Sequence, residues 1–114
     1  MAKVFDRVKE FTSSTGLGNI TTTGSYSSFQ RFSDVLNVGD TTFYAIVDGI
    51  NGSWESGLAT YTSTNVLERT KVFESSNSGE KVSLSSGEKT IFMTYPASQS
   101  ITSTQSIALS IALG

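Results

Sequence analysis

The ionisable and nucleophilic side chains of this sequence offer few ways to build a catalytic site. Its 114 residues include neither histidine nor cysteine, so the common nucleophile–base pairs and zinc sites cannot form. Two carboxylates facing each other could still act as acid and base. The candidates are Asp34, Asp40, Asp48, Glu55, Glu68 and Glu74. Their spacing brings no two of them together, so we expect turn formers and solvated charges, no catalytic residue and no enzymatic activity.

One stretch has the composition of a calcium loop, because Asp48, Asn51, Ser53 and Glu55 alternate with small residues. Calcium prefers clustered oxygen ligands of this kind. The spacing fits no standard loop, however, and the pairs Asp48-Gly49 and Asn51-Gly52 are typical of a β-hairpin turn. We therefore expect a hairpin here, with no metal and no cofactor.

Aromatic side chains suggest a second kind of site. Trp54, Tyr61 and Tyr44 could form a flat platform on which sugar rings stack, beside further tyrosines at 26 and 95. The alternative is core packing, which we expect for Phe43, Phe73 and Phe92 and which Trp54 could join. Aromatic residues in the strands of a small β domain are more often core than platform, so core packing is favoured.

The segment after Pro96 has the clearest alternation of the chain. Between Ile101 and Leu113 one face becomes apolar and the other carries small residues. The apolar face is Ile107, Leu109, Ile111 and Leu113. This pattern fits the last strand of the domain, and it also fits an arm that adds to a neighbouring subunit. We divide the chain into a β domain over residues 1–97 and a terminal strand or intersubunit arm over 98–114.

The elements that would position these residues are strands. Alternation with a period of two recurs between turn residues, and one proline leaves most of the chain free to pair. We expect an all-β fold, an antiparallel sandwich or barrel of roughly seven to eight short strands. At most one short helical turn is expected, near residues 33–38. Residues 4–12 fit a helical face through Val4, Val8 and Phe11 as well as a strand, and we favour a strand that pairs with 19–25 as a hairpin. The other strand ranges are 41–48 (apolar on both faces, hence covered on both sides), 54–61, 66–74, 81–85 and 89–95.

Charge and hydropathy limit the partners. Only 16% of the residues are charged and the net charge is −2, which argues against nucleic acid, since nucleic acid selects clustered lysine and arginine. No apolar run is long enough for a signal peptide or a membrane helix. We therefore expect synthesis and folding in a cytoplasm and no membrane partner.

Several runs of the sequence resemble a β domain of tailed bacteriophages, found in tail-fibre-like and other virion structural proteins. The most specific are FYAIVDG (43–49), SSNSG (75–79) and FMTYPA (92–97), and the likeness extends over about residues 2–97. The resemblance implies attachment to the virion, assembly in the host cytoplasm, a homotrimer and no enzymatic activity.

Members of that family typically continue into a fibre shaft, whereas this sequence stops at Gly114. We therefore expect a capsid decoration or cement protein, or a fibre base, whose partners are its own copies and virion proteins such as the major capsid protein. The alternative is a host-surface carbohydrate-binding module of a tail fibre, which would use Trp54 and the tyrosines.

Overall fold

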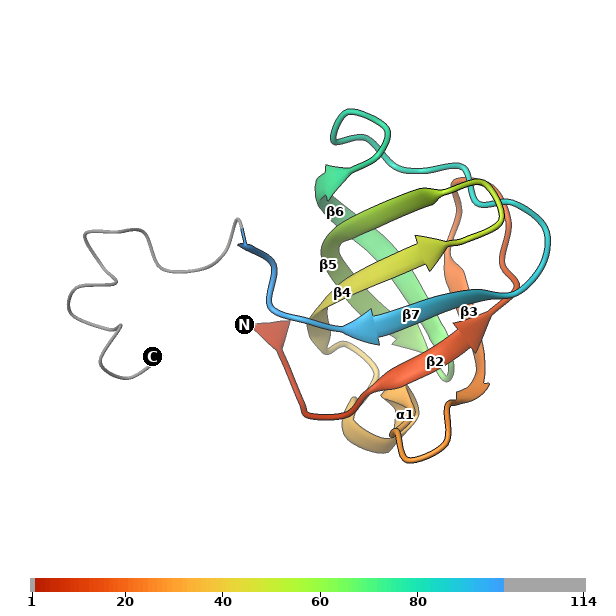
Figure 1. The fold of residues 1–114 in the computed structure, drawn as a ribbon. Coiled ribbons are helices and arrows are strands. Elements are labelled where there is room, and N and C mark those ends of the chain that lie inside the picture. Colours follow the sequence, from red (N-terminus) through yellow and green to blue (C-terminus); the bar gives the residue numbers. More distant parts are fainter. Residues whose placement is uncertain (1, 98–114) are drawn as a thin grey trace.

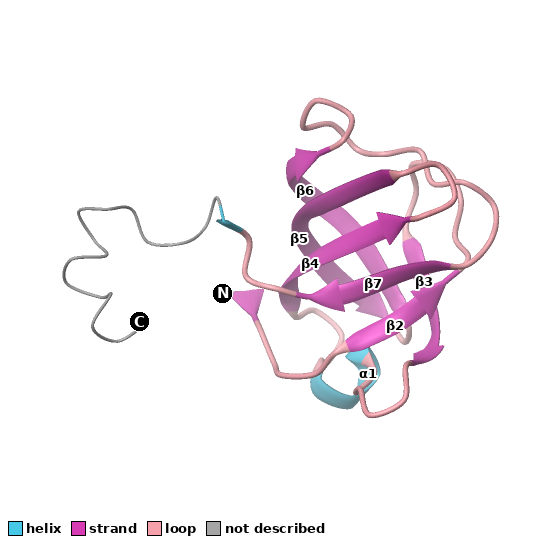
Figure 2. Cartoon of the chain, in the orientation of Figure 1, coloured by secondary structure: helices cyan, strands magenta, loops and turns pink. Residues whose placement is uncertain are grey.

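A closed antiparallel β-barrel of six strands, with one further strand beside it, forms the domain (Figures 1 and 2). The computed structural model describes residues 2–97. It has strands β1 (Ala2–Lys3), β2 (Lys9–Thr12), β3 (Ile20–Ser25), β4 (Thr41–Asp48), β5 (Ser53–Ser63), β6 (Val66–Ser75) and β7 (Lys89–Met93), and one helix, α1 (Phe32–Val35). The predicted all-β class, the strand number and the single helical turn are confirmed.

The strand order around the barrel is β4-β5-β6-β3-β2-β7, and β7 pairs again with β4 to close it. Closure runs from the pair Tyr44–Met93 to the pair Val47–Thr90. Strand β1 lies parallel to the beginning of β4, where β7 has already ended. The N-terminal residues therefore lie next to the point where the described chain leaves the barrel (Figure 1).

The hairpin predicted from Asp48-Gly49 and Asn51-Gly52 is present. Strands β4 and β5 pair from Asp48–Ser53 to Thr41–Thr60, and the turn uses the positive φ of Gly52. Strands β5 and β6 join through Asn65, which also has a positive φ. The β2–β3 pair is present as well, but β2 begins only at Lys9 because Arg7 has a left-handed backbone.

The interior of the barrel takes side chains from one face of each of its six strands. In β4 the buried residues are Thr42, Tyr44, Ile46 and Asp48, while the residues between them are half-buried or exposed. The prediction that this strand is covered on both sides is therefore wrong. The placement of Phe43, Phe73 and Phe92 in the core is wrong for the same reason, since all three lie half-buried outside the core cluster. A closed barrel buries alternate residues, whatever the hydropathy of the outer ones.

The segment after β6 differs from its prediction. Residues 81–85 form no strand and make one isolated bridge, between Leu84 and Gly16. Side chains take the place of a strand partner there: the Glu55 carboxylate accepts a hydrogen bond from the Val82 N–H, and the Asp48 carboxylate accepts one from the Ser85 N–H, both at 2.8 Å. Strand β7 ends at Met93, short of the predicted Tyr95.

Candidate functional site

The three rings of the predicted sugar platform lie in different environments. Tyr44 and Tyr61 are buried in the barrel, where Tyr44 donates a hydrogen bond to Glu55 and Tyr61 accepts one from the Asn65 N–H. Trp54 lies on the outer face of β5, opposite Val47, and is 44% exposed. The structure therefore does not bring these rings together on one surface.

Burial also determines how Tyr44 ionises. Removal from water raises the pKa of Tyr44 well above its ordinary value, and the Glu55 carboxylate beside it adds to the rise. The hydroxyl therefore stays protonated and serves as a donor to Glu55.

An ion pair between Glu55 and Arg69 occupies the interior. Arg69 Nη1 lies 2.9 Å from Glu55 Oε1, and both side chains are fully buried. The guanidinium also donates to the carbonyl oxygens of Gly16 at 2.8 Å, Gly18 at 3.0 Å and Val82 at 2.9 Å. The ion pair therefore joins β5 and β6 to two segments outside the strands, the one that contains Gly16 and Gly18 and the one that contains Val82. This is a structural role.

Glu10 has a similar function at the helix. Its carboxylate accepts hydrogen bonds from Arg31 Nε at 3.1 Å and from the Phe32 N–H at 2.7 Å. The carboxylate is fully buried, so these two bonds satisfy a charge that water cannot reach. Glu10 therefore fixes the start of α1 against β2.

Asp48 anchors the segment before β7. Burial opposes its ionisation, but the N–H and hydroxyl of Ser85, the N–H of Ile50 and the charge of Lys89 outweigh that effect, so the pKa of Asp48 lies below its ordinary value of 3.8. Asp48 and Glu55 thus point to separate partners. Among residues 2–97 no three acidic side chains are placed to hold a metal ion.

This arrangement predicts a specific pH dependence. Because the folded-state pKa of Asp48 is depressed, its ionised form stabilises the fold above the unfolded pKa of about 3.9. That contribution disappears as the pH falls through the folded-state pKa. We expect Asp48→Asn to melt below the unaltered protein at pH 7 and the difference to shrink as the pH falls below the unfolded pKa of Asp48, measured by circular dichroism melts.

Asp40 does not affect this comparison. The Asn37 N–H and the Lys3 ammonium lower the pKa of Asp40 as well, but Asp40 titrates in both proteins, so its contribution cancels in the difference between their melting temperatures. A melting difference that stays constant from pH 7 to pH 2 would contradict the account.

Since the buried carboxylates hold the fold together, the remaining candidate sites lie on the outer surface of the barrel. Phe43 from β4, Phe73 from β6 and Tyr95 form an aromatic group, with ring centroids 6.0 Å apart for Phe43–Phe73 and 5.4 Å for Phe43–Tyr95. A hollow of about 380 Å³ lies beside it, lined by Ala2, Val4, Phe43 and Tyr95. We call Val4, Phe43, Phe73 and Tyr95 the Phe43 cluster.

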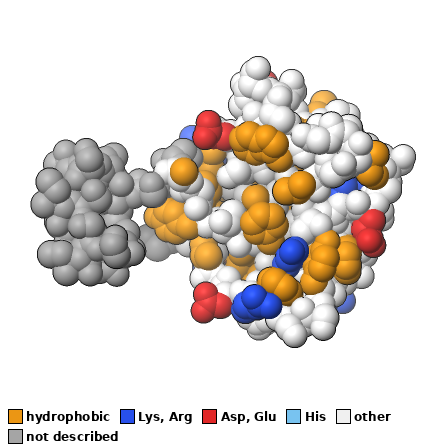
Figure 3. All heavy atoms as spheres, viewed as in Figure 1, with side chains coloured by type: hydrophobic (Ala, Val, Ile, Leu, Met, Phe, Trp, Pro, Cys, Tyr) orange, Lys and Arg blue, Asp and Glu red, His pale blue; other side chains and the backbone are white. Residues whose placement is uncertain are grey.

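A second aromatic group lies over β2. The Phe11 and Tyr26 rings stack with centroids 3.8 Å apart, and Phe29 meets Tyr26 edge-on. The Arg7 guanidinium lies 3.8 Å from the Phe29 ring centroid and Lys9 Nζ lies 4.6 Å from that of Tyr26. The lower part of Figure 3 shows basic side chains beside hydrophobic ones on this face. Both cations are thus held by rings of their own chain.

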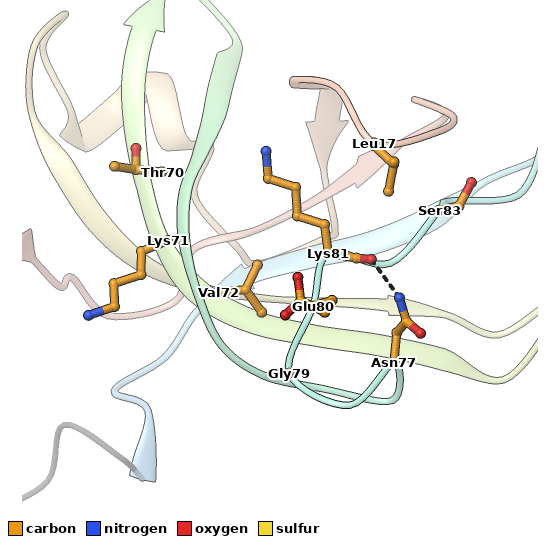
Figure 4. Close-up of a pocket in the computed structure, with 9 residues that line it drawn as sticks. All are labelled: Leu17, Thr70, Lys71, Val72, Asn77, Gly79, Glu80, Lys81 and Ser83. Carbon is orange, nitrogen blue, oxygen red and sulfur yellow. Dashed lines mark hydrogen bonds between the residues drawn. The ribbon is translucent and has the colours of Figure 1, made fainter.

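The third outer feature is the edge of β6. Only Val66 and Leu67 of this strand pair with β3, at Thr21 and Ile20. Beyond them, from Glu68 to Ser75, β6 has no strand neighbour on that side within the described part of the chain. A groove of about 680 Å³ adjoins this edge (Figure 4). Its lining is Leu17, Thr70, Lys71, Val72, Asn77, Gly79, Glu80, Lys81 and Ser83.

The predicted intersubunit contact, Ile107, Leu109, Ile111 and Leu113, lies outside the described residues. Neither the Phe43 cluster nor the buried ion pair of Glu55 with Arg69 was predicted from the sequence. The alternation did contain a signal for the ion pair. Glu55 falls in the same alternating series as Ala59 and Tyr61, and Arg69 falls in the series of Leu67. Both residues therefore occupy positions that face the interior.

No family model matches the chain, and searches of curated proteins and of solved structures find no match either. Within residues 2–97, none of the helical structure is long and apolar enough to cross a membrane.

Proposed function

We propose that this chain is a non-enzymatic structural protein of a bacteriophage particle and that it acts through oligomeric assembly. The observation that carries the proposal is the Phe43 cluster, a group of large apolar side chains that the barrel leaves outside its core. Contiguous exposed apolar surface on a small domain marks a site of protein–protein contact.

The cluster has the composition of an interface centre. Tyr95 is 58% exposed and Val4 42%, and Lys71 Nζ lies 5.6 Å from the Phe73 ring centroid. Aromatic residues are enriched where proteins meet. The residues come from β4, β6 and both ends of the described chain, so the barrel fold itself assembles this surface. Figure 3 shows hydrophobic side chains gathered where the described chain ends.

The virion setting of the proposal rests on the sequence resemblance at FYAIVDG, SSNSG and FMTYPA. By that resemblance the chain forms a homotrimer and contacts virion proteins such as the major capsid protein, as a decoration or cement protein or a fibre base. The alternative, a carbohydrate-binding module, receives less support, because only Trp54 of its three rings lies at the surface.

The role of the Phe43 cluster is testable by a double substitution, Phe43→Ser with Tyr95→Ser. Both side chains point away from the core cluster, so we expect the variant to stay folded and to lose its oligomeric state. Light scattering coupled to gel filtration measures the mass. Val38→Ser is the matched control, since Val38 is 63% exposed and lies outside the Phe43 cluster. An oligomer that survives the double substitution would contradict the assignment, and so would an oligomer that Val38→Ser dissociates equally well.

The virion setting has a separate test. We expect mass spectrometry of purified particles of the virus that encodes the chain to find it in a fixed ratio to the major capsid protein or to a tail protein. Its absence from the particles would overturn the setting, whatever its oligomeric state.

A further inference from the structure

The free edge of β6 is a ready template for another strand. It presents backbone N–H and C=O groups along Glu68–Ser75, where β3 no longer accompanies it. The backbone hydrogen bonds of loops and turns in the described residues do not involve this stretch either. An unpaired edge of this length binds extended segments by adding them to the sheet.

Hydrogen bonds hold the residues that line the groove beside this edge in place. On the far side, Asn77 Nδ2 donates to the Lys81 carbonyl at 3.0 Å (dashed line in Figure 4), and Ser75 Oγ donates to the Glu80 carbonyl. Arg69 holds the next residue, Val82, by its carbonyl. The opening is therefore maintained without a bound segment, which lowers the ordering cost of binding.

We propose that this groove binds residues 107–113 of a second copy of the chain as an added strand. The segment alternates apolar and small residues, which is the pattern of a strand with one buried face. It contains no charged residue, so none of its own side chains carries a charge into the groove. Leu17, which is 55% exposed, and Val72 provide apolar lining for its Ile and Leu face.

The position of β7 favours a second copy over the same chain. Strand β7, from which the terminal segment follows, is three strands away from β6 in both directions around the barrel. A chain that filled its own groove would have to cross the outside of two strands, whereas connections in proteins are short and rarely cross others. When each copy gives one segment and receives one, the exchange closes either between two copies or head to tail around a ring such as a trimer. This inference rests on the proposed assembly function.

Cysteine cross-linking tests the proposal directly, because the chain has no cysteine of its own. Full-length Val72→Cys and full-length Leu109→Cys are mixed under mild oxidation, so that a disulfide between them must join two copies. Docking places the apolar face that carries Leu109 against Val72 in the groove lining, so the two thiols come close enough to pair. The expected result is a covalent heterodimer that forms roughly a hundredfold faster than in the control mixture, because docked thiols have a millimolar effective concentration.

The control mixture pairs Leu109→Cys with Ser27→Cys, an exposed position away from the groove lining. Equal rates in both mixtures would overturn the proposal. So would a double variant, Val72→Cys with Leu109→Cys, that closes its disulfide within one chain, since the segment would then fill its own groove. An oligomer without the cross-link would overturn this inference and leave the assembly function standing, whereas a monomer without the cross-link would contradict both.

Discussion

Replacing Arg69 by methionine is expected to lower the free energy of unfolding by about 3–5 kcal/mol, the usual cost of removing one partner from a buried ion pair. The substitution leaves the Glu55 carboxylate charged in an interior that water does not reach. It also removes the donors to three carbonyl groups, those of Gly16, Gly18 and Val82. Urea denaturation followed by tryptophan fluorescence measures the change.

Two further variants make this result specific. Lys71→Met removes a positive charge from the same strand at an exposed position and should change stability by no more than about 0.5 kcal/mol. Adding Glu55→Gln to Arg69→Met removes the unpaired charge, so the double variant should be more stable than Arg69→Met alone. A loss below about 1 kcal/mol for Arg69→Met would show that the ion pair does not hold the barrel together.

Introducing aspartate at Ile107 and Leu109 together is expected to abolish assembly without changing the stability of the barrel. Burial of each of these side chains contributes about 1.5–3 kcal/mol to an interface. Losing both corresponds to a rise in the dissociation constant of roughly a hundredfold to ten-thousandfold. Sedimentation velocity measures the loss of the oligomer, and urea denaturation measures the unchanged barrel.

Ser110→Asp is the matched control for this pair, because it places the same charge on the opposite face of the segment. We expect it to keep the oligomer. If Ser110→Asp dissociates the protein as strongly as the double substitution, the apolar face has no special role and the segment acts only through its overall polarity.

Local signals in the sequence were sufficient to predict the hairpins. Asp48-Gly49 and Asn51-Gly52 predicted the β4–β5 turn because tight turns require residues that tolerate positive φ. The strand class followed from the alternation around them. These features depend on neighbours along the chain, so they could be predicted without knowing the closure of the barrel.

The closure of the barrel, and which face of each strand points into it, could not be predicted in the same way. The Phe43 face of β4 is as apolar as its Tyr44 face, and only the pairing of β4 with both β5 and β7 decides which one becomes the interior. Hydropathy alone therefore placed the phenylalanines in the core. The same limit applies to residues 81–85, since hydrogen bonds to the distant carboxylates Asp48 and Glu55 replace a strand there.

The candidate site was accessible from the sequence only in part. The terminal alternation predicts a segment suited to binding, because the alternation depends on the period alone, and this stays a prediction. Its proposed acceptor, the free edge of β6, depends on β3 ending its pairing after two residue pairs. No local pattern specifies that length, since it follows from how far β3 runs alongside β6 in the closed barrel.

Sedimentation equilibrium of the unaltered chain over a range of micromolar concentrations tests the central claim of assembly most directly. The account predicts a discrete oligomer, with three chain masses for the trimer that the resemblance implies. A single chain mass over the whole concentration range would contradict it.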